Sequence, residues 1–544
     1  WTASWKVCVN VRGNRSMNNK RYQASRVLVA LFLFFFVICP LIALLVNIDA
    51  KDIHKVLTSP QFQPMVINSL CTTILATLLS VSLAFALAWF MNRSHIRHRS
   101  VYTMLFTLPM LIPSISHGMG LVLLFGDNGI ISNLLHMKFF LYGYVGIILG
   151  SILYSFPVAF LMLNDTFQYE DYTTYEAASV LGLSKRQQFF TITLPNIKGP
   201  LISVVFSVFT MIFTDYGVPL VVGGKSITLP VYMYREVIGL LDFSKGAIIG
   251  ILLLIPAVIA FVLDLKNENK GSSSTVTRSY QIAPNAKRDR IAHIVCIATV
   301  VFLSLPLITF AVLSFVNHYP TDLSLTLDNI IQAMDLGVRM YLKNSLAIAM
   351  LTSMVGVCLT YLTAFMTARN ASQLSSRVLH LVSMISLAIP GVVLGLSYVL
   401  FYKGSFLYGG IAILVLVNIT HFFANPYLMA YNSLQQFHSN LEDISAAMGI
   451  SRFRMLKDVY IPCTKGTIVE MFSYLFVNSM VTISAVSFLA NFRNMPLSLL
   501  IPQFDSQSLI EATAFISVVI LLVNLIVKLL VYVVKRKLIK DHEA

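Results

Sequence analysis

Two segments of this chain repeat one pattern of residues at matching positions. Residues 176–195 read EAASVLGLSKRQQFFTITLP, and residues 443–462 read DISAAMGISRFRMLKDVYIP. In both segments a glycine lies six residues after the acidic residue, and a proline lies thirteen residues after the glycine. The two glycines, Gly182 and Gly449, are 267 residues apart in a chain of 544. A spacing close to half the chain predicts two related halves joined in one polypeptide.

Each segment favours a helix, a turn and a second helix. In the first segment Glu176, Ala177 and Ala178 lie in a helix-forming stretch whose acidic residues come early, near the positive end of the helix. Gly182 then permits a turn, because glycine tolerates backbone angles that are closed to other residues. Pro195 can open the next helix, where its missing N–H costs nothing. The second segment repeats these positions with Asp443, Gly449 and Pro462.

The composition is typical of a membrane protein. The chain is 57% hydrophobic and 12% charged, whereas a soluble domain carries about 25% charged residues. A helix that crosses a bilayer needs roughly 20 mostly apolar residues. We therefore expect an all-α integral membrane protein with twelve transmembrane helices, arranged as two parallel halves of six. The expected spans are about 27–46, 66–90, 101–126, 139–163, 195–215, 245–264, 291–315, 344–368, 378–401, 408–431, 465–490 and 509–534.

The basic charge follows the expected topology. The net charge is +15, which on its own is compatible with nucleic-acid binding. With both termini in the cytoplasm, however, most Lys and Arg residues fall in the inside loops, as the positive-inside rule requires. This distribution explains the charge without a nucleic-acid partner. The inside clusters are at Lys20–Arg26, Arg93–Arg99, Lys266–Arg290 and Lys535–Lys540.

Further repeats support two parallel halves. Asn68-Ser69-Leu70 opens the second span and Asn344-Ser345-Leu346 opens the eighth. Each of these spans ends in a basic turn, at Arg93 and at Arg369. The polar segment between the halves reads as a flexible tether. We predict these parts: an upstream or non-native extension at 1–16, a first half at 17–265 with its loop at 170–195, a cytoplasmic linker at 266–290, and a second half at 291–544 with its loop at 440–462.

The repeated segments resemble the EAA loops of ABC-importer permeases, and we name them the first EAA loop (170–195) and the second EAA loop (440–462). The second departs from the family pattern, since Asp443-Ile444-Ser445 stands where Glu-Ala-Ala is expected. The chain as a whole resembles the fused, two-half permeases of type I ABC importers, a group with ferric-iron, thiamine and 2-aminoethylphosphonate permeases. Residues 213–224 and 479–488 look most like the 2-aminoethylphosphonate type.

The resemblance implies partners and a location. It implies a bacterial inner-membrane protein that crosses the bilayer many times. A homodimer of cytoplasmic ATPase subunits would dock on the two EAA loops. The residues implied in this docking are Glu176, Ala177, Ala178, Gly182, Pro195, Asp443, Gly449 and Pro462. An extracytoplasmic binding protein would deliver the substrate on the other side. ATP binding and hydrolysis would then switch the permease between its inward and outward states.

Polar residues near two span ends are candidates for the substrate pathway. An acid at membrane depth is costly and is often functional, although Asp215 at a span end is equally well explained as a helix-terminal acid. The polar residues of the eleventh span are as readily explained by contacts between helices. The candidates that we retain are Thr214, Asp215, Asn478, Thr482 and Ser484.

Other functions have less support in the sequence. Gly223-Gly224-Lys225-Ser226 lacks the first glycine of a phosphate-binding loop, since Pro219 occupies that position. No cluster of His, Cys, Asp or Glu has the spacing of metal ligands, and we expect neither a catalytic site nor a cofactor. Twelve spans in two parallel halves also suit an ion-coupled secondary transporter, but that alternative predicts charges within the spans and no matched loops. The substrate stays open among 2-aminoethylphosphonate, ferric iron, thiamine and similar small solutes.

Overall fold

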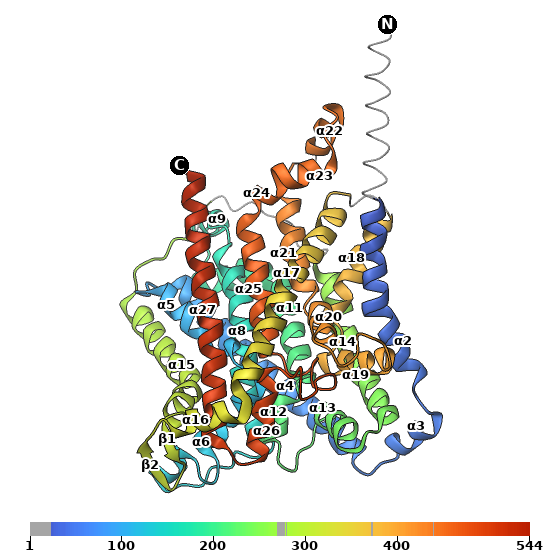
Figure 1. The fold of residues 1–544 in the computed structure, drawn as a ribbon. Coiled ribbons are helices and arrows are strands. Elements are labelled where there is room, and N and C mark those ends of the chain that lie inside the picture. The colour runs from blue at the N-terminus through green and yellow to red at the C-terminus, as the bar shows by residue number, and fades with distance from the viewer. Residues whose placement is uncertain (1–22, 269–277, 279, 371–373, 439, 544) are drawn as a thin grey trace. The chain divides into compact units, whose positions relative to one another are not determined.

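A computed structural model of the chain describes residues 23–268, 278, 280–370, 374–438 and 440–543. The predicted extension at 1–16 lies outside these residues, as do positions 269–277 and 279 of the predicted linker. The described residues are mainly helical (Figure 1), and they include one short antiparallel hairpin of β1 (Val316–His318) and β2 (Asp322–Leu325).

The helices of the first part of the chain follow in this order: η1 (Phe34–Ile38), α2 (Cys39–Val46), α3 (Ala50–Leu57), α4 (Phe62–Arg93), α5 (Arg99–Thr107), η2 (Leu108–Leu111), α6 (Ser114–Phe125), α7 (Ile130–Leu135), α8 (Tyr144–Gln168), α9 (Thr173–Val180), α10 (Lys185–Gln188), η3 (Phe189–Thr193), α11 (Leu194–Phe213), α12 (Gly217–Val222), α13 (Leu229–Tyr234), η4 (Arg235–Gly239) and α14 (Phe243–Glu268).

The second part of the chain contains α15 (Ala286–Leu313), α16 (Asp328–Ala333), η5 (Met334–Val338), α17 (Arg339–Ala368), α18 (Leu374–Met384), η6 (Ile385–Leu387), α19 (Gly391–Tyr402), α20 (Ile411–His421), α21 (Ala424–Gln435), α22 (Asn440–Ala447), α23 (Arg452–Met455), η7 (Leu456–Tyr460), α24 (Ile461–Cys463), α25 (Lys465–Val481), η8 (Leu497–Leu499), α26 (Leu500–Ser506) and α27 (Ile510–Glu543).

The all-helical membrane architecture is confirmed, with fewer unbroken spans than the twelve expected. Nine helices of the described residues are long and apolar enough to cross a membrane, or eleven if two bent pairs are each counted as one span. The pairs α18–η6 with α19 and α20 with α21 bend by 108° and 52°. The expected span 465–490 is helical only to Val481. Thr482, Ser484 and Ser487 follow, and such side chains compete with the backbone for hydrogen bonds.

The repeat seen in the sequence is also a repeat of contacts. At the start of α4, the Asn68 amide donates to the carbonyl of Ile227, and Ser69 Oγ accepts from the backbone of Leu229. At the start of α17, Asn344 donates to the carbonyl of Arg493, and Ser345 Oγ accepts from the backbone of Leu497 at 2.7 Å. The paired Asn-Ser residues therefore hold equivalent returning loops in the two halves.

The chain forms two compact units, and the segments that build them alternate along the sequence. Unit 1 comprises residues up to Asn47, Arg339–Leu497 and the chain from Leu522, whereas unit 2 comprises Ile48–Val338 and Ser498–Leu521. The N-terminal span thus belongs to the unit that the second half builds. Conversely, α15 belongs to unit 2, where its Cys296 joins a core made mainly by α4, α8 and α11.

The N-terminal span is held within unit 1 by two hydrogen bonds to backbone carbonyls that a change in helix geometry leaves free. Pro40 has no N–H to donate four residues back, and the helix passes through the π-helical turn η1 just before it. The freed carbonyl of Phe36 accepts a hydrogen bond from Tyr398 Oη at 2.8 Å, and that of Phe35 accepts one from Tyr402 Oη at 2.9 Å. Figure 1 shows the blue N-terminal helix beside α19, which carries both tyrosines.

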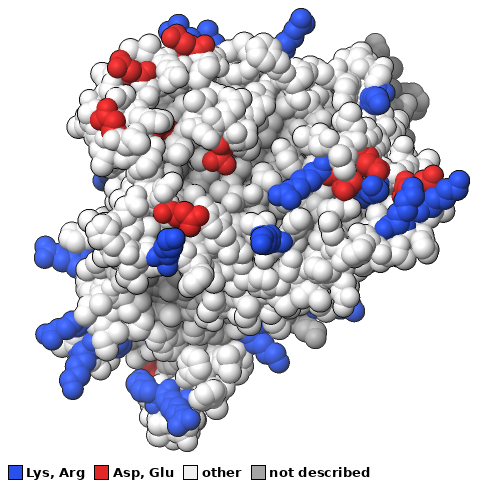
Figure 2. Space-filling model, turned by 90° about the horizontal axis from the view of Figure 1, so that it is seen from below, with Lys and Arg blue, Asp and Glu red and all other residues white. Residues whose placement is uncertain are grey.

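Apolar side chains are exposed along long spans of both units. Figure 2 looks from below onto the ends of the helices, where charged side chains stand in separate groups with uncharged surface between them. Along α4, Leu75, Leu78 and Leu79 are exposed, as is Met354 of α17. Exposed apolar side chains of this kind on long spans are expected where helices face hydrocarbon.

Replacing Tyr398 by Phe is expected to destabilise unit 1. The side chain is buried, and its hydroxyl also lies 2.8 Å from Thr420 Oγ1. Its loss leaves the Phe36 carbonyl without that bond, at a cost of about 1–2 kcal/mol. Thermal unfolding of the detergent-purified protein, followed by far-ultraviolet circular dichroism, measures the change. Tyr408→Phe is the control, since that side chain is exposed, and an equal loss in both variants contradicts the prediction.

Candidate functional site

The two EAA loops have the same local structure, element by element. In the first loop α9 ends at Val180, Gly182 adopts φ +77°, and Ser184 caps α10 by accepting a hydrogen bond from the backbone of Gln187. The π-helical turn η3 then leads into α11, which has Pro195 in its first turn. Each feature follows from the residue type, since serine is a preferred N-cap and proline suits a helix start.

The second loop repeats this order at a constant offset of 267 residues. Here α22 ends at Ala447, Gly449 adopts φ +71°, and Ser451 caps α23. The turn η7 follows, and Pro462 lies in the first turn of α24. The predicted helix, turn and helix are therefore present in both loops.

Both glycines close their helices with the same hydrogen bonds. In the first loop the backbone of Leu183 donates to the carbonyl of Ala178 at 3.0 Å. In the second loop Ile450 donates to Ser445 at 2.8 Å. Such bonds from beyond the helix end define a Schellman motif, which needs a left-handed residue before the donor. Gly182 and Gly449 supply that residue.

A buried arginine anchors the first loop. Arg93, in the last turn of α4, forms an ion pair with Glu170 and donates to Tyr175 Oη at 3.2 Å. Its guanidinium also lies 3.2 Å from the ring centre of Tyr280. Tyr175 Oη in turn lies 2.8 Å from Thr193 Oγ1, which joins the beginning of the loop to its end. The loop is thus fixed to a membrane-spanning helix at two points.

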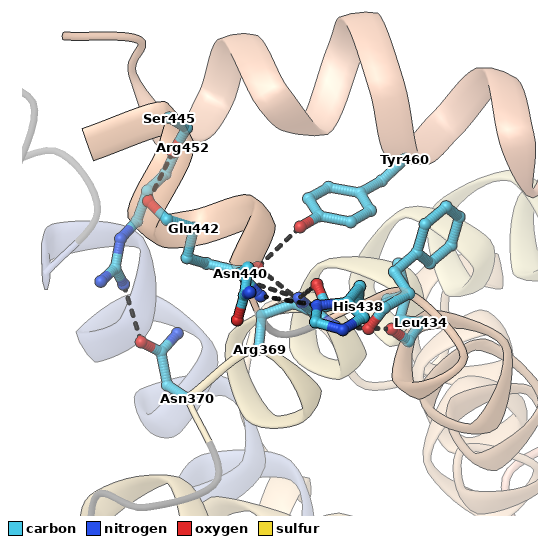
Figure 3. A network of polar contacts seen from close by, with 10 residues as sticks. Arg369, Asn370, Leu434, His438, Asn440, Glu442, Ser445, Arg452 and Tyr460 are labelled. Carbon is cyan, nitrogen blue, oxygen red and sulfur yellow. Dashed lines mark hydrogen bonds and ion pairs between the residues drawn. The ribbon is translucent and has the colours of Figure 1, made fainter. Parts of the chain in front are cut away.

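An equivalent arginine anchors the second loop (Figure 3). Arg369 follows α17, and its guanidinium forms a two-point ion pair with Glu442 at 2.5 Å. It also donates to the backbone carbonyls of Leu434, Phe437 and His438. Tyr460 Oη donates to Glu442 at 2.6 Å, which again joins the beginning of the loop to its end.

The electrostatics of the second anchor favour the ion pair. Burial raises the pKa of Glu442, but the hydrogen bonds from Arg369 and Tyr460 outweigh it, so the pKa lies below its ordinary value. The same hydrogen bond raises the pKa of Arg369, because it stabilises the charged guanidinium. The Glu442 carboxylate is therefore charged at neutral pH and available to hold the loop.

The predicted acidic residues lie outside these anchors. Glu176 is exposed and pairs with Arg278 across 2.7 Å. Asp443 is exposed, and the described residues supply no ion pair for it. The anchoring acids are instead Glu170 and Glu442, which the sequence analysis did not single out. The sequence did contain a signal for the arginines that bind these acids. Arg93 and Arg369 are 276 residues apart, which is also the spacing of Asn68 and Asn344.

Each loop presents apolar side chains at its tip. In the first loop Val180 and Leu181 are 88% and 78% exposed. In the second loop Ile444 and Met448 are 53% and 70% exposed. Leu181 and Met448 occupy equivalent positions, directly before the two glycines. Paired exposed apolar residues on otherwise polar loops are typical of docking surfaces.

The predicted pathway residues lie at two helix breaks. In unit 2, Thr214 and Asp215 fall between α11 and α12, where Asp215 accepts from Ser114 Oγ at 2.6 Å and from the backbone of Val218 at 3.0 Å. In unit 1, Asn478 lies in the last turn of α25, and Thr482 and Ser484 follow that helix. Asp215 also lines a small cavity whose wall is part polar, with Ser69, Thr72, Thr73, Ser151 and Thr228, and part apolar, with Ile147, Ile212, Phe213, Pro219 and Pro230.

The described residues contain no group of three or more His, Cys, Asp or Glu side chains placed to hold a metal ion. His117 is buried in α6, and His421 is half-buried at the end of α20.

Three known transport-system permeases are similar to this chain over more than three quarters of its length. FbpB 1 of Haemophilus influenzae, named for ferric transport, is 25% identical over 491 residues, which are 86% of this chain and 77% of that protein. The ferric transport system permease protein FbpB of Actinobacillus pleuropneumoniae is 24% identical over 489 residues, or 85% and 70%. The thiamine transport system permease protein ThiP of Escherichia coli is 22% identical over 435 residues, or 78% and 80%.

A family model matches the chain twice. The matched stretches are residues 76–266 and 356–540, and each contains one EAA loop. Together they cover more than half of the 544 residues. The chain therefore belongs to the family described as the inner membrane component of binding-protein-dependent transport systems.

Proposed function

We propose that this chain is the permease subunit of an ATP-driven importer and that its two EAA loops receive the ATPase subunits. The observation that carries the proposal is the pair of loops, which share their turns, their arginine anchors and their exposed apolar tips. A secondary transporter needs no such matched pair. The alternative of an ion-coupled carrier also conflicts with membership of a binding-protein-dependent family.

The anchors give the loops a mechanical role. Each loop is held at its beginning and its end, and its arginine comes from the end of a membrane-spanning helix. A push on the exposed tip therefore moves the loop and the helix together instead of bending the loop. ATP-driven closure of the ATPases would bring the loops together and favour one of two global states of the permease.

The partners follow from this role. A homodimer of cytoplasmic ATPases would place one subunit on each loop, and an extracytoplasmic protein would deliver the cargo to the opposite side. Both termini of the chain would then lie in the cytoplasm of a bacterial cell, with the loops on the same side of the inner membrane. Asp215 and Thr482 and their polar neighbours at the helix breaks are candidates for the cargo pathway.

We propose ferric iron as the cargo. The two ferric permeases match about 85% of this chain, and the thiamine permease matches 78%. The case for 2-aminoethylphosphonate rests on residues 213–224 and 479–488 alone. In importers of this kind the binding protein selects the cargo, so the permease sequence is a weak guide to it.

Alanine at either loop glycine is expected to uncouple transport from ATP hydrolysis. Neither glycine has a neighbouring atom within 4 Å of an added Cβ, so the cost comes from the positive φ alone, about 1–2 kcal/mol. We expect Gly182→Ala and Gly449→Ala each to lower substrate-stimulated ATPase activity about fivefold in proteoliposomes that contain all subunits.

The control for this experiment is Gly404→Ala. Gly404 also has a positive φ, +86°, and open space around it, but it lies after α19 and outside both loops. It therefore reports the effect of the same backbone strain elsewhere. Equal losses in all three variants would show that the strain acts on the whole protein and not on the loops.

Removal of the second anchor is expected to have a larger effect. Arg369→Gln leaves Glu442 without its ion pair, which costs on the order of 1–3 kcal/mol, so we expect transport to fall about tenfold while the protein still inserts in the membrane. Arg454→Gln is the matched control, because Arg454 is an exposed arginine of the same loop that pairs with Asp458. Transport measured as uptake into vesicles separates the two variants.

The cargo is tested by supplying ferric iron, thiamine and 2-aminoethylphosphonate separately to proteoliposomes that contain the binding protein and the ATPase. We expect ferric iron to stimulate ATP hydrolysis and uptake several-fold. Stimulation by thiamine or by the phosphonate alone would replace the proposed cargo. If the ATPase does not associate with the permease, the proposed function itself is wrong.

A further inference from the structure

Two residues of the segment that joins the halves lie on the first EAA loop. Arg278 pairs with Glu176, and its backbone N–H donates to Asp171 Oδ1 at 3.2 Å. Its carbonyl accepts from the backbone of Tyr172 at 2.9 Å. Main-chain bonds on both sides of Arg278 fix its position along the start of α9, so this contact is more than a surface ion pair.

Tyr280 extends the contact to the buried anchor. Its ring packs edge-on against Tyr172 and Tyr175, with ring centres 5.1 and 5.2 Å apart. The guanidinium of Arg93 lies over the same ring. Nε and Nη1 of Arg93 are buried without a hydrogen-bond partner, and a ring beneath a guanidinium stabilises its charge. Tyr280 therefore completes the surroundings of the arginine that holds the first loop.

The second loop has a ring of its own beside its arginine and receives three further carbonyls from residues just before it. The guanidinium of Arg369 lies 5.5 Å from the ring centre of Tyr460, at the end of η7. The equivalent position of the first loop is Thr193, which has no ring. The first loop supplies the ring of Tyr175, whose centre lies 5.1 Å from the Arg93 guanidinium, and the joining segment adds the ring of Tyr280 at 3.2 Å.

We propose that Arg278 and Tyr280 are positioning residues that brace the first EAA loop for the ATPase. A segment that serves only as a tether needs no contacts with either loop. The proposal rests on the proposed function, because it assumes that the loops dock ATPase subunits. It makes the two docking sites unequal, since only the first depends on the segment between the halves.

The test uses light-activated crosslinking at equivalent loop tips. The photoreactive residue p-benzoylphenylalanine replaces Leu181 in one protein and Met448 in another, each expressed with the ATPase and the binding protein. The crosslinked yield of ATPase is then compared between the parent and the double variant Arg278→Ala/Tyr280→Ala. We expect the yield at position 181 to fall about fivefold, in line with the loss of an ion pair and a cation–π contact, and the yield at 448 to stay unchanged.

Two further variants sharpen the result. Tyr280→Phe keeps the ring and is expected to retain the parental yield at 181. Arg290→Ala removes an exposed arginine of the same joining region and is expected to change neither yield. An unchanged or increased yield at 181 in the double variant overturns the brace, as does an equal fall at both positions. Absence of crosslinks at both positions in the parent protein contradicts the proposed function instead.

Discussion

The structure depends most on a guanidinium held at the end of a membrane-spanning helix. A buried charge needs both a counter-charge and hydrogen bonds, and each EAA loop is folded so as to supply them. Arg93 and Arg369 meet this need with different residues, since one uses Glu170 and aromatic rings and the other uses Glu442 and three carbonyls. The position of the arginine is common to both halves, whereas the means of compensating its charge differ.

Residue patterns predicted the regular parts of this fold well. Apolar runs located the long spans, and the glycine and proline spacing located both loops, because these features act through the nearby backbone. The breaks were harder to place. The helix that begins at Lys465 ends at Val481, whereas the length of the run to residue 490 predicted that it would continue past Thr482, Ser484 and Ser487. The anchoring acids were missed for a related reason: Glu170 and Glu442 occupy different positions in the two loops, so comparison of the repeats could not pair them.

The asymmetry between the loops has a simple physical origin in the fused chain. The arginine of the second loop is compensated by Glu442, Tyr460 and three carbonyls that lie just before the loop, without residues of the joining segment. Once the halves are joined, a nearby segment is always present at high local concentration. Residues of that segment can then add contacts to the loop, and Tyr280 packs against Arg93 in this way.

The first span of each half packs in the unit that the other half mainly builds, and this has a consequence for biosynthesis. The N-terminal span packs on α19, which lies about 350 residues later, so at about 5–20 residues per second its partner is synthesised roughly 20–70 s after it. During that interval the freed carbonyls of Phe35 and Phe36 lack their tyrosine partners. Of the nine spans found in the described residues it has the highest mean hydropathy, 3.1, which lets it stay inserted alone. A polar substitution there would therefore harm the growing chain before it could harm the finished transporter.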